Sequence, residues 1–136
     1  MTSSMPKPTV LYIIDDDRED RDFLIEALKE IDPSIEFFTA INGQEGLKKL
    51  NTNSIPIPSI IFLDLHMPRI NGKQFLIEIQ NDAAYNSIPV IIYTTSSNQK
   101  EIDEMMQLGA TGYLVKQWDY TVLKEKLNAI FAIFSE

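Results

Sequence analysis

Residues 10–31 read VLYIIDDDREDRDFLIEALKEI and contain one strand, one loop and one helix in succession. The first five residues are apolar without alternation, which is typical of a strand that is covered on both faces. Beyond three consecutive aspartates, apolar residues recur at helical spacing from Asp20 to Ile31, and Pro33 ends the pattern. A buried strand followed by an amphipathic helix predicts a sheet that is covered by helices.

The same alternation of an apolar run and a helical pattern occurs five times. The runs, rich in β-branched or aromatic residues, span residues 10–14, 35–40, 60–63, 88–93 and 112–115. The helical patterns span residues 20–31, 43–50, 73–80, 100–108 and 120–134. This order predicts an α/β domain with a flavodoxin-like, doubly wound (βα)5 fold, whose parallel five-stranded sheet has the order 2-1-3-4-5. The second and fifth runs are mixed or short, which favours the sheet edges.

The composition limits the class of protein. With 136 residues and a mass of 15.5 kDa, the chain has the size of one domain. Acidic residues outnumber basic ones by 20 to 12, and the net charge of −8 argues against nucleic-acid and anionic-membrane partners, which require clustered lysine and arginine. The absence of cysteine excludes disulfides and thiolate sites, and no apolar run approaches the ~20 residues of a membrane span.

The first eight residues, MTSSMPKP, differ from the rest of the chain. They are polar, contain two prolines and lack the apolar segment of a secretory signal. We therefore predict a disordered tail over residues 1–8, a single domain over residues 9–136, and a cytoplasmic protein.

Polar residues directly follow four of the five runs. The first run ends in Asp15 and Asp16, the third in Asp64, the fourth in Thr94 and the fifth in Lys116. Because the carboxyl ends of parallel strands meet at one edge of a sheet, we expect these side chains to lie close together. In the order 2-1-3-4-5, the ligand-binding switch point lies between the first and third strands, which carry the three aspartates.

Three carboxylates at one sheet edge repel one another unless some are protonated or a cation lies between them. With oxygen ligands only, a hard divalent ion such as Mg²⁺ fits best. The ammonium of Lys116 and the hydroxyl of Thr94 can hold the oxygens of a phosphoryl group attached to one carboxylate, and aspartate is a known phosphoryl acceptor. Four further acids at the start of the first helix are interpreted as caps or as partners of the helix dipole: Asp17, Glu19, Asp20 and Asp22.

Several motifs together resemble a known family. They are the pair Asp15–Asp16, DLHMP at residues 64–68 followed by Asn71 and Gly72, VIIYT at residues 90–94, and GATGYLVK at residues 109–116. In this order and at these spacings, the chain from about residue 10 to residue 134 resembles the receiver domains of two-component response regulators, and among them the stand-alone chemotaxis receivers.

The resemblance implies a role for each site residue. Asp64 is the expected phosphoryl acceptor and Asp16 a direct Mg²⁺ ligand, while Asp15 acts through water. The metal is also expected to bind Asp64 and the backbone carbonyl of His66.

Three residues on the fourth and fifth strands have roles in the expected response. Thr94 and Lys116 hold the phosphoryl group, and Tyr113 is the aromatic switch residue that turns inward when Thr94 moves. The imidazole of His66 either faces the phosphoryl group or covers the rim of the pocket.

The implied function is a phosphorylation-activated switch of a phosphorelay. The expected donor is a sensor histidine kinase or a histidine phosphotransfer protein, and the signal passes by protein contact to an unidentified target. The chain is expected to be no enzyme beyond its own Mg²⁺-dependent phosphorylation and dephosphorylation. It ends shortly after the last helix, so we expect no output domain, and a monomer or weak dimer.

One departure from the family pattern leaves alternatives open. Gln117 follows Lys116, where the family usually has proline after a cis peptide bond, and we expect a trans bond here because a cis non-proline bond costs about 3–4 kcal/mol. Gln117 also favours a pseudo-receiver that binds protein without being phosphorylated. A haloacid-dehalogenase-like phosphatase is the other alternative, because Asp15 and Asp17 fit its Asp-x-Asp spacing, although no acidic pair follows the fourth strand.

Overall fold

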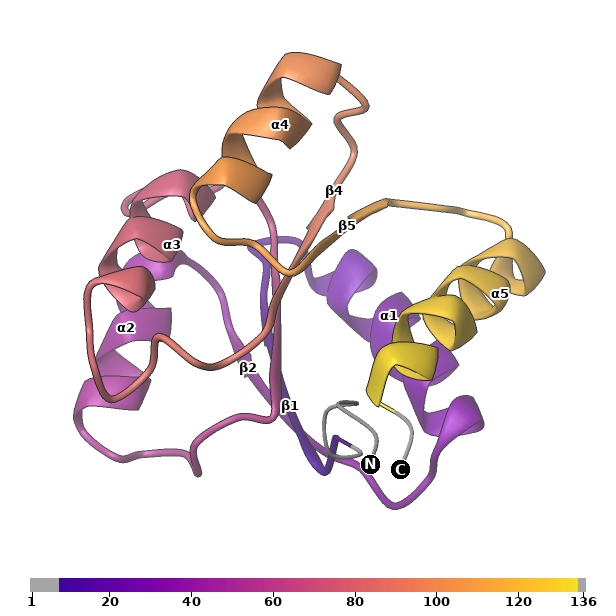
Figure 1. Ribbon diagram of the computed structural model, residues 1–136. Coiled ribbons are helices and arrows are strands. Elements are labelled where there is room, and N and C mark those ends of the chain that lie inside the picture. The colour runs from indigo at the N-terminus through magenta and orange to yellow at the C-terminus, as the bar shows by residue number, and fades with distance from the viewer. Residues whose placement is uncertain (1–7, 135–136) are drawn as a thin grey trace, which may run out of the picture.

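The computed structural model describes residues 8–134, within which five strands alternate with five α-helices (Figure 1). The strands are β1 (Val10–Ile14), β2 (Glu36–Ala40), β3 (Ile60–Leu63), β4 (Val90–Thr94) and β5 (Gly112–Val115). The helices are α1 (Arg18–Ile31), α2 (Gly43–Asn51), α3 (Gly72–Gln80), α4 (Gln99–Gln107) and α5 (Tyr120–Phe131), followed by a 3-10 turn, η1 (Ala132–Phe134). The final helical pattern was expected to continue to residue 134 as one α-helix, but its last three residues tighten into this turn.

The strands form one parallel sheet in the order β2-β1-β3-β4-β5, which confirms the flavodoxin-like prediction. The two mixed or short strands, β2 and β5, lie at the edges as expected. In the register of β1 with its two neighbours, Ile14 pairs with Ala40 on one side and with Leu63 on the other. The residues that follow β1 and β3 therefore emerge side by side at the carboxyl edge of the sheet.

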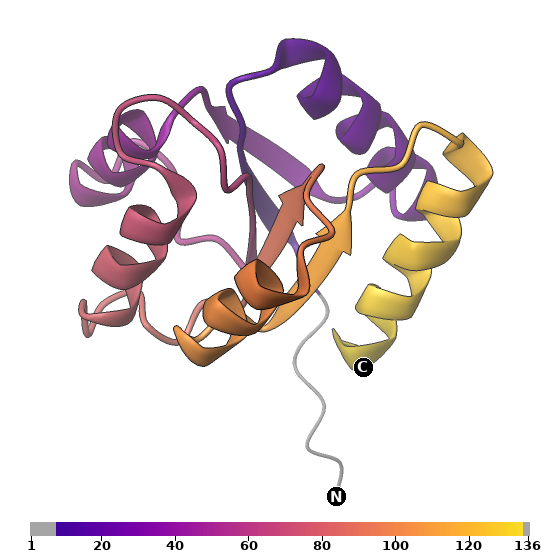
Figure 2. The ribbon, with the colours of Figure 1, turned by 90° about the horizontal axis from the view of Figure 1, so that it is seen from above.

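Helices cover both faces of the sheet, with α1 and α5 on one face and α2, α3 and α4 on the other (Figures 1 and 2). Side chains along β1 alternate between these faces: Leu11 and Ile13 pack towards α1 and α5, whereas Tyr12 and Ile14 pack towards α2 and α3. All four are fully buried. Burial on both faces explains why the strand is apolar without alternation.

Each of the five helices within residues 8–134 begins after an aspartate or asparagine whose side chain accepts a hydrogen bond from a backbone N–H of the first turn. These caps are Asp17, Asn42, Asn71, Asn98 and Asp119. Because every helix follows a strand, the five caps lie at the carboxyl edge of the sheet. This edge is therefore rich in polar side chains for structural reasons as well as for any function.

Two further predictions concern the N-terminal tail and membrane-spanning segments. Residues 1–7 of the tail lie outside the described residues, and Pro8, the last residue of the predicted tail, is described and buried. None of the helices within residues 8–134 is long and apolar enough to cross a membrane.

Candidate functional site

Three aspartates meet where β1 and β3 end. One carboxylate oxygen from each of Asp15, Asp16 and Asp64 lies within 4.8 Å of the others. The register explains this proximity, because the backbone N–H of Asp64 donates to the carbonyl of Ile14 at 3.0 Å. Asp15 and Asp64 are buried, whereas Asp16 is exposed. The structure thus brings together the three acids that the strand ends predicted.

Lys116 enters this cluster from the end of β5. Its Nζ lies 2.8 Å from Asp15 Oδ2, 2.7 Å from Asp20 Oδ2 and 3.6 Å from Asp64 Oδ2. Only 3% of its side chain is exposed, and its Nζ lies 5.4 Å from the centre of the Tyr93 ring. The ammonium is therefore held by carboxylates from β1, α1 and β3 in a site from which water is largely excluded.

Burial and neighbouring charges shift the protonation equilibria of this cluster. Burial raises the pKa of Asp64 to about 6, although the nearby Lys116 opposes the shift. Burial also raises the pKa of Asp15, and Lys116 again opposes the shift. For Lys116, burial favours the neutral amine, but the interactions with Asp15 and Asp20 outweigh it and raise the pKa above its usual value. Three carboxylates around one ammonium, with that of Asp16 beside two of them, leave a pocket of excess negative potential, which favours a cation.

The donor set fits a hard divalent ion. The two oxygens of Asp15 differ. Oδ1 accepts from the backbone N–H of Asp17 at 2.9 Å, whereas the buried Oδ2 forms an ion pair with Lys116 at 2.8 Å but has no hydrogen-bond partner. Asp64 Oδ1 accepts one long bond, from the backbone N–H of His66 at 3.3 Å, and Asp16 is open to solvent. Oxygen donors of this kind suit Mg²⁺, which binds few protein groups and keeps several waters. The direct binding of the ion by Asp16 and Asp64, and its binding through water by Asp15, stay predictions.

Thr94 and Tyr113 connect the pocket to the loop between β4 and α4. Thr94 is fully buried, and its carbonyl accepts from the backbone N–H of Lys116 at 2.7 Å. Its hydroxyl oxygen accepts a long bond, at 3.4 Å, from the N–H of Ser96. The hydroxyl of Tyr113 donates to the carbonyl of the same Ser96. The two expected switch residues therefore hold the same residue of the β4–α4 loop.

The side chain of His66 lies at the rim of the pocket and not inside it. Its imidazole is 59% exposed, and Nε2 lies 3.5 Å from Glu101 Oε1 on α4. Of the two orientations that the sequence left open, this structure has the one at the rim. The expected role of the His66 backbone carbonyl as a metal ligand stays a prediction.

Gly72 positions the loop that carries Asp64. A Cβ at this position would lie 2.4 Å from the carbonyl oxygen of Asp64 and 2.7 Å from the Cα of Leu65. The backbone of the first residue of α3 thus lies directly against the backbone of the candidate acceptor. No side chain larger than hydrogen fits without moving this loop.

Asp20 lies in the first turn of α1, as interpreted, but it also has a role that the sequence did not predict. Its side chain is only 10% exposed and bonds Lys116, although the two residues are 96 positions apart. A signal was present in the sequence, since Asp20 lies four and eight residues before Leu24 and Leu28, on the buried face of α1. The neighbouring Arg21 also went unnoticed, and its guanidinium donates to the carbonyl of Asp15 at 2.7 Å.

The other acids at the start of α1 agree with the interpretation. Asp17 is the N-cap and accepts from the N–H of Asp20 at 3.1 Å, and Glu19 and Asp22 are exposed.

Every peptide bond within residues 8–134 is trans, including the one between Lys116 and Gln117. The expected trans geometry is confirmed.

Comparison with known proteins identifies the family of this chain. Residues 11–128 match the response regulator receiver domain family. Chemotaxis protein CheY1 of Helicobacter pylori (strain ATCC 700392 / 26695) is 28% identical over 120 residues, which cover 88% of this chain and 94% of that protein. Among solved structures, the Mn²⁺-bound form of response regulator Rcp1 has a TM-score of 0.80 and 27% identity, and the match covers 90% of this chain and 91% of that one.

A second solved structure is similar over most of its length. The phosphorylated cyanobacterial phytochrome response regulator RcpA has a TM-score of 0.84 and 25% identity, and the match covers 93% of each chain. The family match spans most of the sequence and includes all four strand ends that carry the site residues. This chain therefore belongs to the response regulator receiver domain family of two-component signalling.

Proposed function

We propose that this chain is a phosphorylation-activated switch that accepts a phosphoryl group on Asp64 from a phosphohistidine donor, with Mg²⁺ bound beside it. The observation that carries the proposal is the buried carboxylate of Asp64, with an ammonium 3.6 Å away and two further carboxylates within 4.8 Å. Such an arrangement combines a nucleophile, a fixed positive charge and a cation site around one atom.

The proposed transfer is a displacement at phosphorus. A carboxylate oxygen of Asp64 forms the new P–O bond while the P–N bond of the phosphoimidazole breaks, and the electron pair of that bond stays on the ring nitrogen. Lys116 stabilises the charge on the phosphoryl oxygens, and the divalent ion supplies further charge neutralisation when bound. The chain thus contributes position and electrostatics, which is the usual share of a protein in phosphoryl transfer.

The proposed response begins at Thr94 and Lys116. A phosphoryl group on Asp64 adds acceptor oxygens that compete for the hydroxyl of Thr94 and the ammonium of Lys116. Thr94 contacts Ser96, which also holds Tyr113, so movement of Thr94 is transmitted to the β4–α4 loop. Changing a two-state population from 1:99 to 99:1 requires about 5.5 kcal/mol of differential stabilisation, to which several charge-assisted hydrogen bonds contribute.

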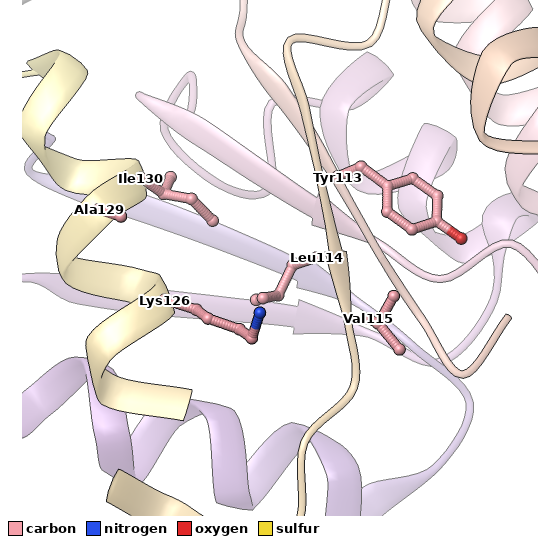
Figure 3. A pocket seen from close by; sticks show the side chains of 6 residues that line it. All are labelled: Tyr113, Leu114, Val115, Lys126, Ala129 and Ile130. Atoms are coloured by element: carbon pink, nitrogen blue, oxygen red, sulfur yellow. The ribbon is translucent and has the colours of Figure 1, made fainter. Parts of the chain in front are cut away.

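The surface proposed to read this change includes a pocket of about 300 Å³ between β5 and α5 (Figure 3). In the figure, the ring of Tyr113 points away from α5. The pocket is lined by Tyr113, Leu114, Val115, Lys126, Ala129 and Ile130. On α4, Met105 is buried in the core, whereas Met106 is 41% exposed and offers an adaptable contact.

We propose that the chain is a monomer or a weak dimer. Sedimentation velocity tests this proposal.

Two solved relatives, one with a bound metal ion and one phosphorylated, support the proposal. Rcp1 has been solved with Mn²⁺ and RcpA in a phosphorylated form, and both have the fold of this chain. A divalent ion and a phosphoryl group are therefore compatible with this architecture. Mg²⁺ and the phosphohistidine donor remain proposals for this chain.

The test is incubation with acetyl phosphate and Mg²⁺, followed by intact-mass measurement. We expect one added phosphoryl group on the wild type, none on Asp64→Asn and none in the presence of EDTA. Asp22→Asn is the matched control, because Asp22 is exposed on α1 and its loss changes the net charge equally. A phosphoryl group that survives Asp64→Asn would place the acceptor elsewhere.

The same experiment separates the alternatives. A pseudo-receiver would remain unmodified while folded. A phosphatase would release phosphate steadily from many phosphate esters, but Asp17 serves as the cap of α1, and its N–H donates to Asp15. This use of Asp17 argues against an Asp-x-Asp catalytic pair. We propose that the chain is no enzyme beyond its own phosphorylation and dephosphorylation.

A further inference from the structure

We propose that Asp20 is a positioning residue that draws Lys116 away from Asp64 and so weakens the hold of this chain on its phosphoryl group. The inference rests on the proposed function, because it concerns how tightly the phosphorylated state is bound. Asp20 touches neither the acceptor nor the metal cluster, and it acts through Lys116.

The position of the ammonium is the first observation. Lys116 Nζ lies 2.7 Å from Asp20 Oδ2 but 3.6 Å from Asp64 Oδ2. The shorter distance is that of a charge-assisted hydrogen bond, whereas the longer one is outside the usual range. The lysine expected to hold the phosphoryl group thus bonds an acid on α1 instead of the acceptor.

The second observation is that Asp20 cannot readily follow the lysine. Its backbone N–H is held by the cap residue Asp17 at 3.1 Å, and the next turn of the helix packs into the core through Leu24. Within residues 8–134, Lys116 is the side-chain partner of the Asp20 carboxylate. If the ammonium moves towards Asp64, this bond lengthens.

Burial makes the competition strong. The side chains of Lys116 and Asp20 are 3% and 10% exposed, so water replaces neither partner easily. An ammonium has three hydrogens, and Asp15 and Asp20 both lie within hydrogen-bond distance of it. One hydrogen remains for the phosphoryl oxygens, but the ammonium can approach them only as its buried bond to Asp20 lengthens, and the negative charge of Asp20 also opposes that of the phosphoryl group.

The test uses beryllofluoride, a stable mimic of the phosphoryl group, titrated in saturating Mg²⁺ by isothermal calorimetry. We expect Asp20→Asn to bind it roughly three- to tenfold more tightly than the wild type, because one competing charge-assisted hydrogen bond is removed. The affinity for Mg²⁺ alone should change far less, because Asp20 lies outside the metal cluster. We expect the phosphoryl group of the acetyl-phosphate-treated variant to be lost more slowly by a similar factor.

Two matched variants separate positioning from charge and from folding. Asp22→Asn removes the same charge from an exposed position on α1 and should bind beryllofluoride like the wild type. Asp20→Glu keeps the charge and should restore an affinity close to that of the wild type. If Asp20→Asn does not fold, Asp20→Ser keeps a small polar group in the first turn and takes its place.

The outcomes distinguish this inference from the proposed function. Equal affinities of Asp20→Asn and Asp22→Asn would overturn the role of Asp20 while leaving the switch intact. Weaker binding by Asp20→Asn would also overturn it, since Asp20 would then hold Lys116 in place for the phosphoryl group. A folded wild type that takes neither beryllofluoride nor a phosphoryl group would overturn the proposed function and this inference together.

Discussion

Two lysine–carboxylate pairs of nearly equal length occupy opposite environments in this molecule. Lys73 on α3 lies 2.6 Å from Glu104 on α4, and both side chains are about half exposed, at 48% and 46%. Lys116 lies 2.7 Å from Asp20 and is almost completely buried. The distances alone would rank the two pairs as equals.

Exposure to solvent makes the contributions of the two pairs to stability different. An exposed pair is screened by water and contributes about 0–1 kcal/mol to stability. In a buried pair the loss of hydration offsets much of the attraction, but removal of one partner leaves an uncompensated charge. The Lys73 pair is thus a minor surface contact, whereas the Lys116 cluster contributes little net stability and becomes costly once it is broken. Substitutions in each region test this contrast.

The largest expected effect is that of Lys116→Met. At pH 8 without Mg²⁺, we expect the free energy of unfolding to fall by about 3 kcal/mol, because buried carboxylates lose their counter-ion. Urea unfolding followed by circular dichroism measures it. The loss should shrink below pH 6, where the carboxyl groups take up protons. A loss under about 1 kcal/mol at pH 8 would remove the contrast between the two regions.

The next effect separates loop geometry from charge. In Gly72→Ala the new Cβ meets backbone atoms of Asp64 and Leu65 at 2.4 and 2.7 Å, so the loop must shift. We expect a loss of about 2 kcal/mol and slower labelling by acetyl phosphate. Gly46→Ala is the control, because its Cβ first meets the flexible end of Ile14 at 3.0 Å. Equal losses in the two variants would contradict the role given to Gly72.

An effect of similar size and opposite sign is expected for Asp64→Asn. Burial raises the pKa of Asp64 from 3.8 to about 6 in the folded state, so the native protein binds the proton more tightly than the unfolded chain. Stability is therefore greatest at low pH within this range and decreases as the pH rises from about 4 to 6. Above that range without Mg²⁺, the variant should be more stable than the wild type by roughly 2 kcal/mol.

Unfolding free energies of the two proteins between pH 4 and 8 provide the measurement. The decrease should be much smaller in Asp64→Asn, and Mg²⁺ should stabilise the wild type more than the variant. A variant that is less stable than the wild type at pH 8 would contradict the pKa assignment.

The smallest effect is expected at the surface. Lys73→Met removes the exposed pair with Glu104 and should change the free energy of unfolding by less than about 0.5 kcal/mol, with acetyl phosphate labelling unchanged. Thermal and urea unfolding measure the first, and intact mass the second. A change as large as that of Lys116→Met would show that burial is not the factor that separates the two pairs.

The sheet and the centre of the site could both be predicted from the sequence, and for the same reason. Apolar runs such as VLYII mark strands that are buried on both faces, and a parallel order brings their carboxyl ends together. Asp15, Asp16 and Asp64 could therefore be grouped without coordinates. The strand bounds were close to those observed, whereas α1 begins at Arg18, two residues earlier than its apolar pattern.

The remaining part of the site depends on contacts between distant segments. Asp20 meets Lys116 only because α1 packs beside the end of β5, and neither local spacing nor charge identifies that pair. The side chain of His66 likewise turns to Glu101, a residue on another helix. Such orientations are set by tertiary packing, which a single sequence does not encode in a local pattern.

The asparagine cap of α3 has an electrostatic consequence. Each of the other four helices within residues 8–134 has a carboxylate at its cap or in its first turn, whereas α3 begins with Asn71 and no acid in that turn. The partial positive charge at the N-terminus of α3, about half an elementary charge, is thus left without an acidic side chain in the first turn. Because Gly72 lies against the backbone of Asp64, this helix end adds a fixed positive field beside the acceptor.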